Sequence, residues 1–368
     1  MIAKKEQTDA EIIEKLKNEA MAVINSAKDR KNPKITIPLR SLNNVYFDEK
    51  DKIIKLGGKH QTRNFFNVGQ AKRFMQTFLV ANACKDIIES GKTTSIRDLY
   101  YMTKHTIGKT NENTFDDQDE SDPIIEDIEV AFDALREELH LFASSKGAIV
   151  GDITIVDSGD DIDCRKQGSG GHAIPSICEP NVIQFKECSA KYILFIEKDA
   201  VWRRFNEDKF WKKHQCVIMH GQGVPPRGVR RLLRRMTDEL KLPLYVLVDA
   251  DPWGLYIYSV IKQGSINLAY ESVRMAVPSA RFIGLSAMDH EKYNLPNDVI
   301  IRLNEEDKRR IREILKYPWF QKPAWQRELN YMMENDVKME LEALSRKRIS
   351  FITETYLPEK IAKKEWLE

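Results

Sequence analysis

The sequence predicts an α/β fold whose C-terminal part is a doubly wound parallel sheet, preceded by a smaller α+β domain. One observation is an apolar run at residues 244–248 that ends in Asp249-Ala-Asp251. Another is an apolar run at residues 191–196 that ends on Glu197. From residue 191 onward, strand-like and helix-like segments alternate, which is the pattern of βαβ units with a parallel sheet.

Composition sets wide bounds on function. The chain has 368 residues, enough for two or three domains. Its formal net charge of +2 neither supports nor excludes a nucleic-acid partner. We find no apolar run that could span a membrane and no signal peptide, so we expect a cytoplasmic protein with no membrane partner. The five cysteines form no CxxC pair, and the segment holding three of them with His172 fits no zinc spacing, which favours ordinary thiols.

Residues 1–68 predict an N-terminal arm made of one helix and a small β element. Between residues 10 and 30, apolar side chains recur at helical spacing. They are Ile12, Ile13, Leu16, Ala20, Val23 and Ile24. Short strand-like runs follow at residues 35–39, 44–48 and 53–58. The apolar stripe either packs against the chain's own domain or docks a partner subunit, and the pattern alone does not choose.

Residues 69–157 have the element order of a winged helix-turn-helix. We expect helices at residues 71–89 and from Ser95, where Asp98 completes a variant of the capping box. Pro123 is expected to open a third helix at residues 124–139, and residues 147–156 are rich in strand formers. Three helices followed by a β-hairpin are typical of the winged helix. The acidic third helix counts against a simple reader of the major groove.

Residues 158–190 predict an inter-domain linker, because glycine-rich loop signals cluster there. Glycines near Arg165-Lys166 could instead cradle a phosphate, although a connector is favoured. The domain at residues 191–368 follows, with strands expected at residues 191–196, 216–219, 244–248 and 281–285 and helices at residues 200–210, 227–240 and 253–261. After Asn304 the chain is expected to be mostly helical, at residues 313–317, 325–334 and 338–344.

Three carboxylates are predicted to meet at one edge of this sheet. Glu197 and Asp249 follow parallel strands directly, and Asp251 is two residues further on. Ligands of open α/β sheets bind at the carboxyl ends of the strands. Carboxylates so close together repel one another unless a cation lies between them, and oxygen ligands suit Mg²⁺. The plainer alternative is a turn with a helix-capping aspartate.

Arginines on the expected helix at residues 227–240 form a basic stripe. Their spacing of three, four and seven residues places them on one helix face: Arg227, Arg230, Arg231 and Arg234. A solvated surface would explain such a stripe. Beside the paired aspartates, contact with a phosphodiester backbone is the interpretation that we favour.

Two adjacent tyrosines, Tyr100 and Tyr101, lie on the second expected helix. Neighbouring helical residues point about 100° apart. Tyr100 therefore leans toward the apolar stripe, and Tyr101 shares a face with Arg97, Lys104 and His105. Nearby positive charge favours a phenolate, the form that attacks phosphorus. Most tyrosine pairs on helices are core packing, so this motif alone is weak.

Together these motifs resemble one family. Arg97-Asp-Leu-Tyr-Tyr101 on a winged helix, followed by Glu197 and Asp249-Ala-Asp251, looks like the A subunit of topoisomerase VI with its Toprim metal-binding module. The segment at residues 221–231, Gly-Gln-Gly-Val-Pro-Pro-Arg-Gly-Val-Arg-Arg, matches the archaeal type. The chain is also similar to the meiotic transesterase that makes programmed double-strand breaks. The resemblance runs from about residue 70 to the C-terminus.

The resemblance implies a CAP-like winged-helix domain at residues 69–157 and a Toprim domain at residues 191–368 with a helical C-terminal elaboration. It implies the cleavage subunit of a type IIB, ATP-dependent DNA topoisomerase. Tyr101 would form a 5′-phosphotyrosyl link, and Glu197, Asp249 and Asp251 would hold Mg²⁺. Glu197 could also relay a proton, and Arg97 would steady the phosphate or the phenolate.

The implied partners are double-stranded DNA, a separate B subunit that binds ATP, and a second copy of the chain, in an A2B2 heterotetramer. In such an assembly the tyrosine of one copy meets the metal site of the other. The N-terminal arm is expected to dock the B subunit. Two alternatives stay open: a stand-alone break-making transesterase without strand passage, and a non-catalytic winged-helix DNA-binding protein. The intact Tyr101 and carboxylates count against the second.

Overall fold

The computed structural model describes residues 7–367, and the chain divides into two compact units. Unit 1 comprises Met1–Asn44 and Leu56–Ser144, and unit 2 comprises Val45–Lys55 and Ser145–Glu368. Within the described range, no helix is both long and apolar enough to cross a membrane. Each unit has its own core, and each is described by itself below.

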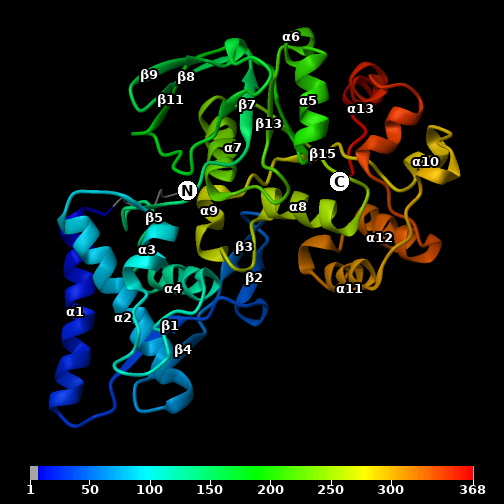
Figure 1. Ribbon diagram of the computed structural model, residues 1–368. Coiled ribbons are helices and arrows are strands. Elements are labelled where there is room, and N and C mark those ends of the chain that lie inside the picture. Colours follow the sequence, from blue (N-terminus) through cyan, green and yellow to red (C-terminus); the bar gives the residue numbers. More distant parts are fainter. Residues whose placement is uncertain (1–6, 368) are drawn as a thin grey trace. The chain divides into compact units, whose positions relative to one another are not determined.

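Unit 1 is mainly helical. Its helices are α1 (Asp9–Lys28), α2 (Val68–Glu89), α3 (Ile96–Thr103) and α4 (Gln118–Ala131). Two small sheets accompany them, the antiparallel pair β1 (Lys34–Pro38) and β4 (His60–Asn64) and the parallel pair β5 (Thr94–Ser95) and β6 (Leu141–Phe142). Helices α1 and α2 lie side by side (Figure 1), and apolar side chains from all four helices form one core.

The N-terminal helix belongs to this core rather than to a separate arm. Thr8 caps α1 in a reciprocal capping box with Glu11. Ile12 and Leu16 are buried in the cluster that α2, α3 and α4 complete. Further along, Ile24 is 45% exposed. The first half of the apolar stripe therefore packs against the chain's own unit, which was one of the two alternatives.

Local capping chemistry sets the boundaries of α3 and α4. Ser95 caps α3 as expected, accepting a hydrogen bond from the Asp98 amide at 3.0 Å. The expected third helix at residues 124–139 was wrong at both ends. Asp117 caps α4 through the amide of Glu120, so the helix begins before Pro123 and ends at Ala131.

Unit 2 contains the predicted sheet, with two additional strands. Strands β12 (Ile193–Ile196), β13 (Val217–His220), β14 (Leu244–Leu247) and β15 (Arg281–Phe282) run parallel, as expected. The six-stranded order is β10–β7–β13–β12–β14–β15. Strand β7 (Ala148–Gly151) runs antiparallel to both of its neighbours, β13 and β10 (His172–Ala173). The expected hairpin at residues 147–156 was wrong, because its first strand pairs with β13.

Residues 158–190 do not form a linker, which corrects that prediction. Strands β8 (Ile153–Asp157), β9 (Asp160–Asp163) and β11 (Ile183–Cys188) form an antiparallel three-stranded sheet (Figure 1). One of the loop signals, at residues 158–159, is the tight turn between β8 and β9, and the glycines at residues 168–171 lead into β10 of the main sheet. A hairpin from the expected arm, β2 (Val45–Asp48) and β3 (Ile53–Leu56), is assigned to unit 2 over most of its length. Neither the arm nor the linker is therefore an independent segment.

Helices surround the sheet and fill the C-terminal region. They include α5 (Asp199–Glu207), α6 (Phe210–His214), α7 (Arg227–Glu239), α8 (Pro252–Gln263), α9 (Ser272–Met275), α10 (Asp289–Lys292), α11 (Glu305–Ile314), α12 (Pro323–Asn335) and α13 (Leu357–Lys363). Trp319, Phe320 and Leu344 are buried, as expected of core residues. The helix expected at residues 338–344 was wrong at its start, because Lys338 and Met339 form bridges to Ile301 and Ala250.

Burial of α1 gives a stability prediction. Ile12→Ala should lower the free energy of unfolding of unit 1 by about 2–5 kcal/mol, because it leaves a cavity at a fully buried site. The matched control Ile24→Ala, on the same helix but exposed, should change it by no more than about 0.5 kcal/mol. Urea unfolding followed by circular dichroism measures both. Equal effects would mean that α1 does not contribute to the core.

Candidate active site

The carboxylates of unit 2 meet at the edge of the sheet that the sequence predicts. Strands β12 and β14 are parallel neighbours, with Ile196 opposite Leu247. The amide of Glu197 donates to the Leu247 carbonyl at 3.0 Å. The amide of Asp249 in turn donates to Oε2 of Glu197 at 3.4 Å. Adjacent strand ends therefore place these two side chains together.

Backbone amides hold the two aspartates. Asp251 caps α8, with Oδ1 accepting from the Gly254 amide at 2.6 Å, so the plainer helix-cap interpretation is also correct. Oδ1 of Asp249 accepts from the amide of Leu341 at 2.8 Å. Ala250, between them, exchanges two backbone hydrogen bonds with Met339. The loop that carries both aspartates is thus fixed by the C-terminal region.

Lys198 supplies a positive charge inside this cluster. Its Nζ lies 2.9 Å from Asp249, 3.2 Å from Glu340 and 3.0 Å from Glu342. Burial of the ammonium works against its charge, but Asp249 and Glu342 outweigh that effect and raise the pKa of Lys198. Lys198 is therefore charged and acts as a counter-ion for Asp249.

Burial and mutual repulsion make the carboxylates hard to ionise. Burial, together with the charges of Asp249 and Asp251, raises the pKa of Glu197 to about 8. Burial likewise raises the pKa of Asp249 to about 6, although Lys198 and the Leu341 amide oppose this. The pKa of Asp251 is also raised, mainly by burial. A further positive charge near these three carboxylates would therefore favour their ionised forms.

The donor set fits a hard divalent cation, but its oxygens do not yet converge. Carboxylate oxygens at one edge, desolvated and repelling, are the groups that Mg²⁺ prefers. In the described part of the chain, no group of three or more acidic, histidine or cysteine side chains is arranged to hold a metal. Four of the six oxygens already have partners: both of Asp249, from Lys198 and the Leu341 amide, one of Asp251, from the helix cap, and one of Glu197, from the Asp249 amide.

The two tyrosines on α3 differ as predicted. Tyr101 is 60% exposed, whereas Tyr100 is 7% exposed. The hydroxyl of Tyr100 donates to the Asp116 carbonyl at 3.1 Å and accepts from Nζ of Lys104 at 2.7 Å. Because its hydrogen-bonding capacity is filled by neighbours within unit 1, Tyr100 has a structural role. Tyr101 is the tyrosine of this pair that a substrate could reach.

The cationic face assigned to Tyr101 needs a correction. Helix α3 ends at Thr103, and Lys104 adopts an extended conformation, with φ −80° and ψ 114°. Helical spacing therefore does not extend to Lys104 or His105, and the Lys104 ammonium contacts Tyr100 instead. Arg97 does lie one turn before Tyr101 on the helix, and it is exposed. It is the one predicted cation that stays in helical register with Tyr101.

Three family models match consecutive parts of the chain. The model of the Toprim domain shared by Spo11 and the topoisomerase 6 A subunit covers residues 192–361. The model described as "Type IIB DNA topoisomerase" covers residues 72–141, and "All-beta domain in DNA topoisomerase VI alpha subunit" covers residues 146–189. The last range contains the three-stranded sheet in the segment for which the sequence predicts a linker.

Curated relatives match almost the whole chain. The A subunit of type 2 DNA topoisomerase 6 from Pyrococcus horikoshii is 44% identical over 95% of this chain and 94% of its own length. The chain belongs to the topoisomerase VI A subunit family. The Methanocaldococcus jannaschii relative of the same name is 36% identical over 90% of this chain and 89% of its own, and the A3 subunit of DNA topoisomerase 6 from Oryza sativa is 33% identical over 98% and 80%.

In this topoisomerase VI A chain, three of the four arginines of the predicted DNA-binding stripe bind internal partners and the fourth is buried, so the stripe is not a solvent-facing basic surface. Arg227 pairs with Glu271 at 2.5 Å, and Arg231 makes a two-pronged contact with Glu179 at 2.8 and 2.9 Å. Arg234 pairs with Asp238 at 2.6 Å. Arg230 is buried, which lowers its pKa to about 10. Periodicity showed one helix face but not the acidic residues that cover it.

Sequence reasoning missed Lys198 and its two glutamates. Lys198 directly follows Glu197, so a cation next to a predicted metal ligand was a usable signal. Glu340 and Glu342 lie in the C-terminal region, for which the sequence predicts helices and no chemistry. Only the fold brings them to the Lys198 ammonium.

The desolvated cluster predicts a pH dependence. In the unfolded chain, the Glu197 carboxyl group has a pKa near 4.5. In the folded chain its pKa is about 8, so it keeps its proton up to that pH. The folded state thus binds more protons in this window, so wild-type stability falls as pH rises through it. Without divalent cation, Glu197→Gln should be increasingly more stable than wild type from about pH 5 to 8, by up to about 4 kcal/mol.

Urea unfolding in EDTA at a series of pH values measures this difference. Glu305→Gln is the matched control, because that carboxylate is 85% exposed and stays in water in both states. A Glu197→Gln advantage that is constant over the window would show that Glu197 is not desolvated beside Asp249.

Proposed function

We propose that the chain, as the DNA-cleavage subunit of a type IIB topoisomerase, cuts the duplex through Tyr101. The observation that carries this assignment is the contrast on α3. Tyr101 is exposed on the helix, whereas the Tyr100 hydroxyl is held by Lys104 and Asp116. A nucleophile must reach the phosphorus atom with a free lone pair. The exposure of Tyr101 supports this role, whereas the burial of Tyr100 and its two hydrogen bonds count against it.

The proposed reaction is a transesterification at one backbone phosphate on each strand. The Tyr101 oxygen attacks phosphorus and loses its proton, while the bond from phosphorus to the 3′-oxygen breaks. The products are a 5′-phosphotyrosyl link and a 3′-hydroxyl, and the number of phosphoester bonds is unchanged. Arg97, one turn earlier on α3, would hold the phosphate or the developing phenolate by charge-assisted hydrogen bonds. Reversal reseals the strand.

Glu197, Asp249 and Asp251 would hold the Mg²⁺ that the family uses. The bound ion would supply positive charge that neutralises and positions the phosphate. The pKa of Glu197 is raised to about 8 and that of Asp249 to about 6, so the Glu197 carboxyl group is the better suited of the two to pass a proton to the 3′-oxygen. Asp249 and Asp251, fixed by the Leu341 and Gly254 amides, would keep their positions throughout.

The proposed partners follow from family membership. The substrate is double-stranded DNA, and a separate B subunit would bind ATP. Two A subunits would pair so that Tyr101 of one reaches the carboxylates of the other, within an A2B2 heterotetramer. Since Ile12 and Leu16 are buried in unit 1, the exposed second half of α1, with Met21 and Ile24, is the part left to dock the B subunit. The five unpaired cysteines suit the reducing cytoplasm.

Replacing each tyrosine tests the nucleophile. Tyr101→Phe removes one exposed oxygen and keeps the ring, so folding should be unaffected and the covalent protein–DNA adduct should disappear. Tyr100→Phe is the matched control on the neighbouring residue. It breaks the contacts to Lys104 and Asp116, so stability should fall by about 1 kcal/mol while the adduct persists.

The assay incubates end-labelled DNA with both subunit types and Mg²⁺. A denaturing gel then detects the adduct, and peptide mapping identifies the linked residue. An adduct that survives in Tyr101→Phe, or that maps to Tyr100, would overturn the assignment.

A further inference from the structure

A pocket of about 730 Å³ lies in unit 2, away from the carboxylates. It is lined by the β2–β3 hairpin, the end of α8, the start of β15, residues 318–323 and Trp366. Arg281 at its wall pairs with Tyr245 on β14, four residues before Asp249. At about 3.3 Å per residue, the pocket is therefore displaced by about 13 Å along the strand from the aspartates. The pocket therefore lies toward the amino ends of these strands, whereas the aspartates follow the carboxyl ends.

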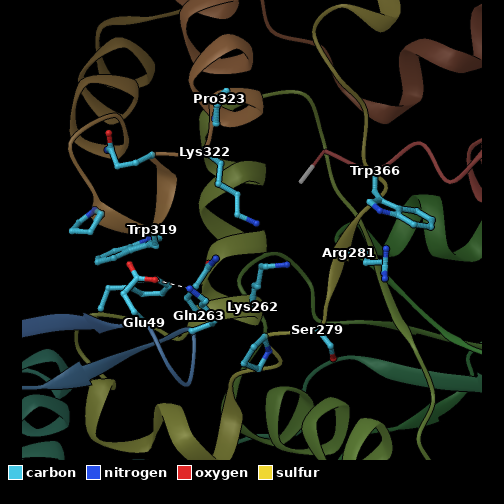
Figure 2. A pocket seen from close by; sticks show the side chains of 14 residues that line it. Glu49, Lys262, Gln263, Ser279, Arg281, Trp319, Lys322, Pro323 and Trp366 are labelled. Carbon is cyan, nitrogen blue, oxygen red and sulfur yellow. Dashed lines mark hydrogen bonds and ion pairs between the residues drawn. The ribbon is translucent and has the colours of Figure 1, made fainter.

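Two indole rings flank this pocket. Figure 2 shows Trp319 and Trp366 on its two sides, with the side chains of Lys262 and Lys322 extending into the space between them. Trp319 stacks on Tyr317 with ring centroids 4.8 Å apart, so its position is fixed from behind. Flat aromatic walls with a volume in the range of small-molecule sites suit a planar ring.

The lining is strongly cationic. Lys52, Lys262, Arg281 and Lys322 face a single carboxylate, Glu49, which pairs with Lys52 at 2.5 Å. The Arg281 guanidinium lies 4.3 Å from the centre of the Trp366 ring. Among the described residues it has no hydrogen bond or ion pair. Stacking fixes the plane of a guanidinium and leaves its N–H groups available for a two-pronged contact with an oxyanion.

Two buried polar atoms of the lining residues have no partner within residues 7–367. They are Oε1 of Gln263, an acceptor, and Nε1 of Trp319, a donor. Unsatisfied buried polar atoms are costly and uncommon in native proteins. A ligand that carries both a donor and an acceptor on a flat ring would satisfy them after a small shift of either side chain.

We propose that this pocket binds a nucleoside phosphate, with its base on the Trp319 indole and its phosphate on Arg281, Lys262 and Lys322, since the Trp366 ring already carries the Arg281 guanidinium. Inorganic phosphate would use only the cations, and an uncharged aromatic molecule would use only the rings. A nucleoside phosphate uses both, together with the donor and acceptor of Trp319 and Gln263. The same chemistry is offered by a free nucleotide and by an unpaired nucleotide of DNA. The site is distinct from the cleavage centre and does not depend on the proposed function.

Calorimetric titration of the full chain in EDTA tests the proposal, because removal of divalent cations keeps the carboxylate cluster out of the measurement. One arm uses ADP, a second a 5′-phosphorylated thymidine dinucleotide, and a third inorganic phosphate. Binding in the first arm identifies a free nucleotide as the source, and binding in the second identifies a nucleotide of DNA. Both should exceed phosphate binding by at least about tenfold, since stacking adds about 1–3 kcal/mol per base.

Arg281→Gln should weaken whichever probe binds by at least about tenfold, the scale of one charge-assisted hydrogen bond. Lys322→Gln, at the exposed rim, should weaken it as well and provides a second variant if Arg281→Gln is unstable. Arg309→Gln is the matched control, because that arginine is exposed on α11 outside the pocket. Its affinity should equal that of wild type.

Several results would overturn the proposal. They are the absence of binding by ADP and by the dinucleotide at millimolar concentration, phosphate binding as tight as nucleotide binding, and equal affinities for Arg281→Gln and wild type.

Discussion

Repulsion among three desolvated carboxylates is the constraint on which the catalytic unit depends. Parallel pairing of β12 and β14 places Glu197 and Asp249 at one sheet edge, and the cap of α8 adds Asp251. Burial removes the water that would screen their charges. Lys198 partly offsets this repulsion, because its ammonium contacts Asp249, Glu340 and Glu342. In the proposed function, a metal ion would take the place of this side-chain cation.

The C-terminal region supports the same cluster. The backbone bonds between Ala250 and Met339, and from the Leu341 amide to Asp249, tie this region to the aspartate loop. Glu340 and Glu342 then offer Lys198 a second place to bind. If a divalent cation takes the Asp249 oxygen, the ammonium can keep its charge paired by moving fully onto these glutamates. The C-terminal residues thus serve the site although none is a predicted ligand.

Burial also separates the two tyrosines. Tyr100 is enclosed and hydrogen-bonded from both sides, while Tyr101 keeps its oxygen in solvent one residue later. In the proposed function, the tyrosine and the carboxylates take part in one reaction. The structure contributes the reason why one of two adjacent hydroxyls is available.

Local patterns predicted what local physics decides. The four parallel strands, the Ser95 cap and the meeting of Glu197 with Asp249 all followed from periodicity, capping chemistry and strand direction. The failures involve distant partners. Residues 148–151 pair with β13, about seventy positions further along the chain, so the expected hairpin could not be recognised as part of the main sheet.

The prediction that the arginines of α7 form a solvent-facing basic stripe failed for the same reason. Glu179 and Glu271, which pair with Arg231 and Arg227, are far from them in sequence. The prediction that Lys104 lies beside Tyr101 was wrong because α3 ends at Thr103. Lys104 is therefore outside the helix, and its ammonium contacts Tyr100 instead. Pairing across the chain, and the exact end of a helix, are set by tertiary packing that periodicity does not contain.

Binding of Mn²⁺ to the isolated chain, measured by electron paramagnetic resonance, tests the central claim most directly. If Lys198 is the internal cation of the cluster, Lys198→Met should bind Mn²⁺ more tightly than wild type by about tenfold or more, the scale on which one neighbouring charge shifts a pKa. Asp249→Asn should bind it more weakly. Affinity that is unchanged or lower in Lys198→Met would contradict the account, because Lys198 would then not occupy the place of the metal ion.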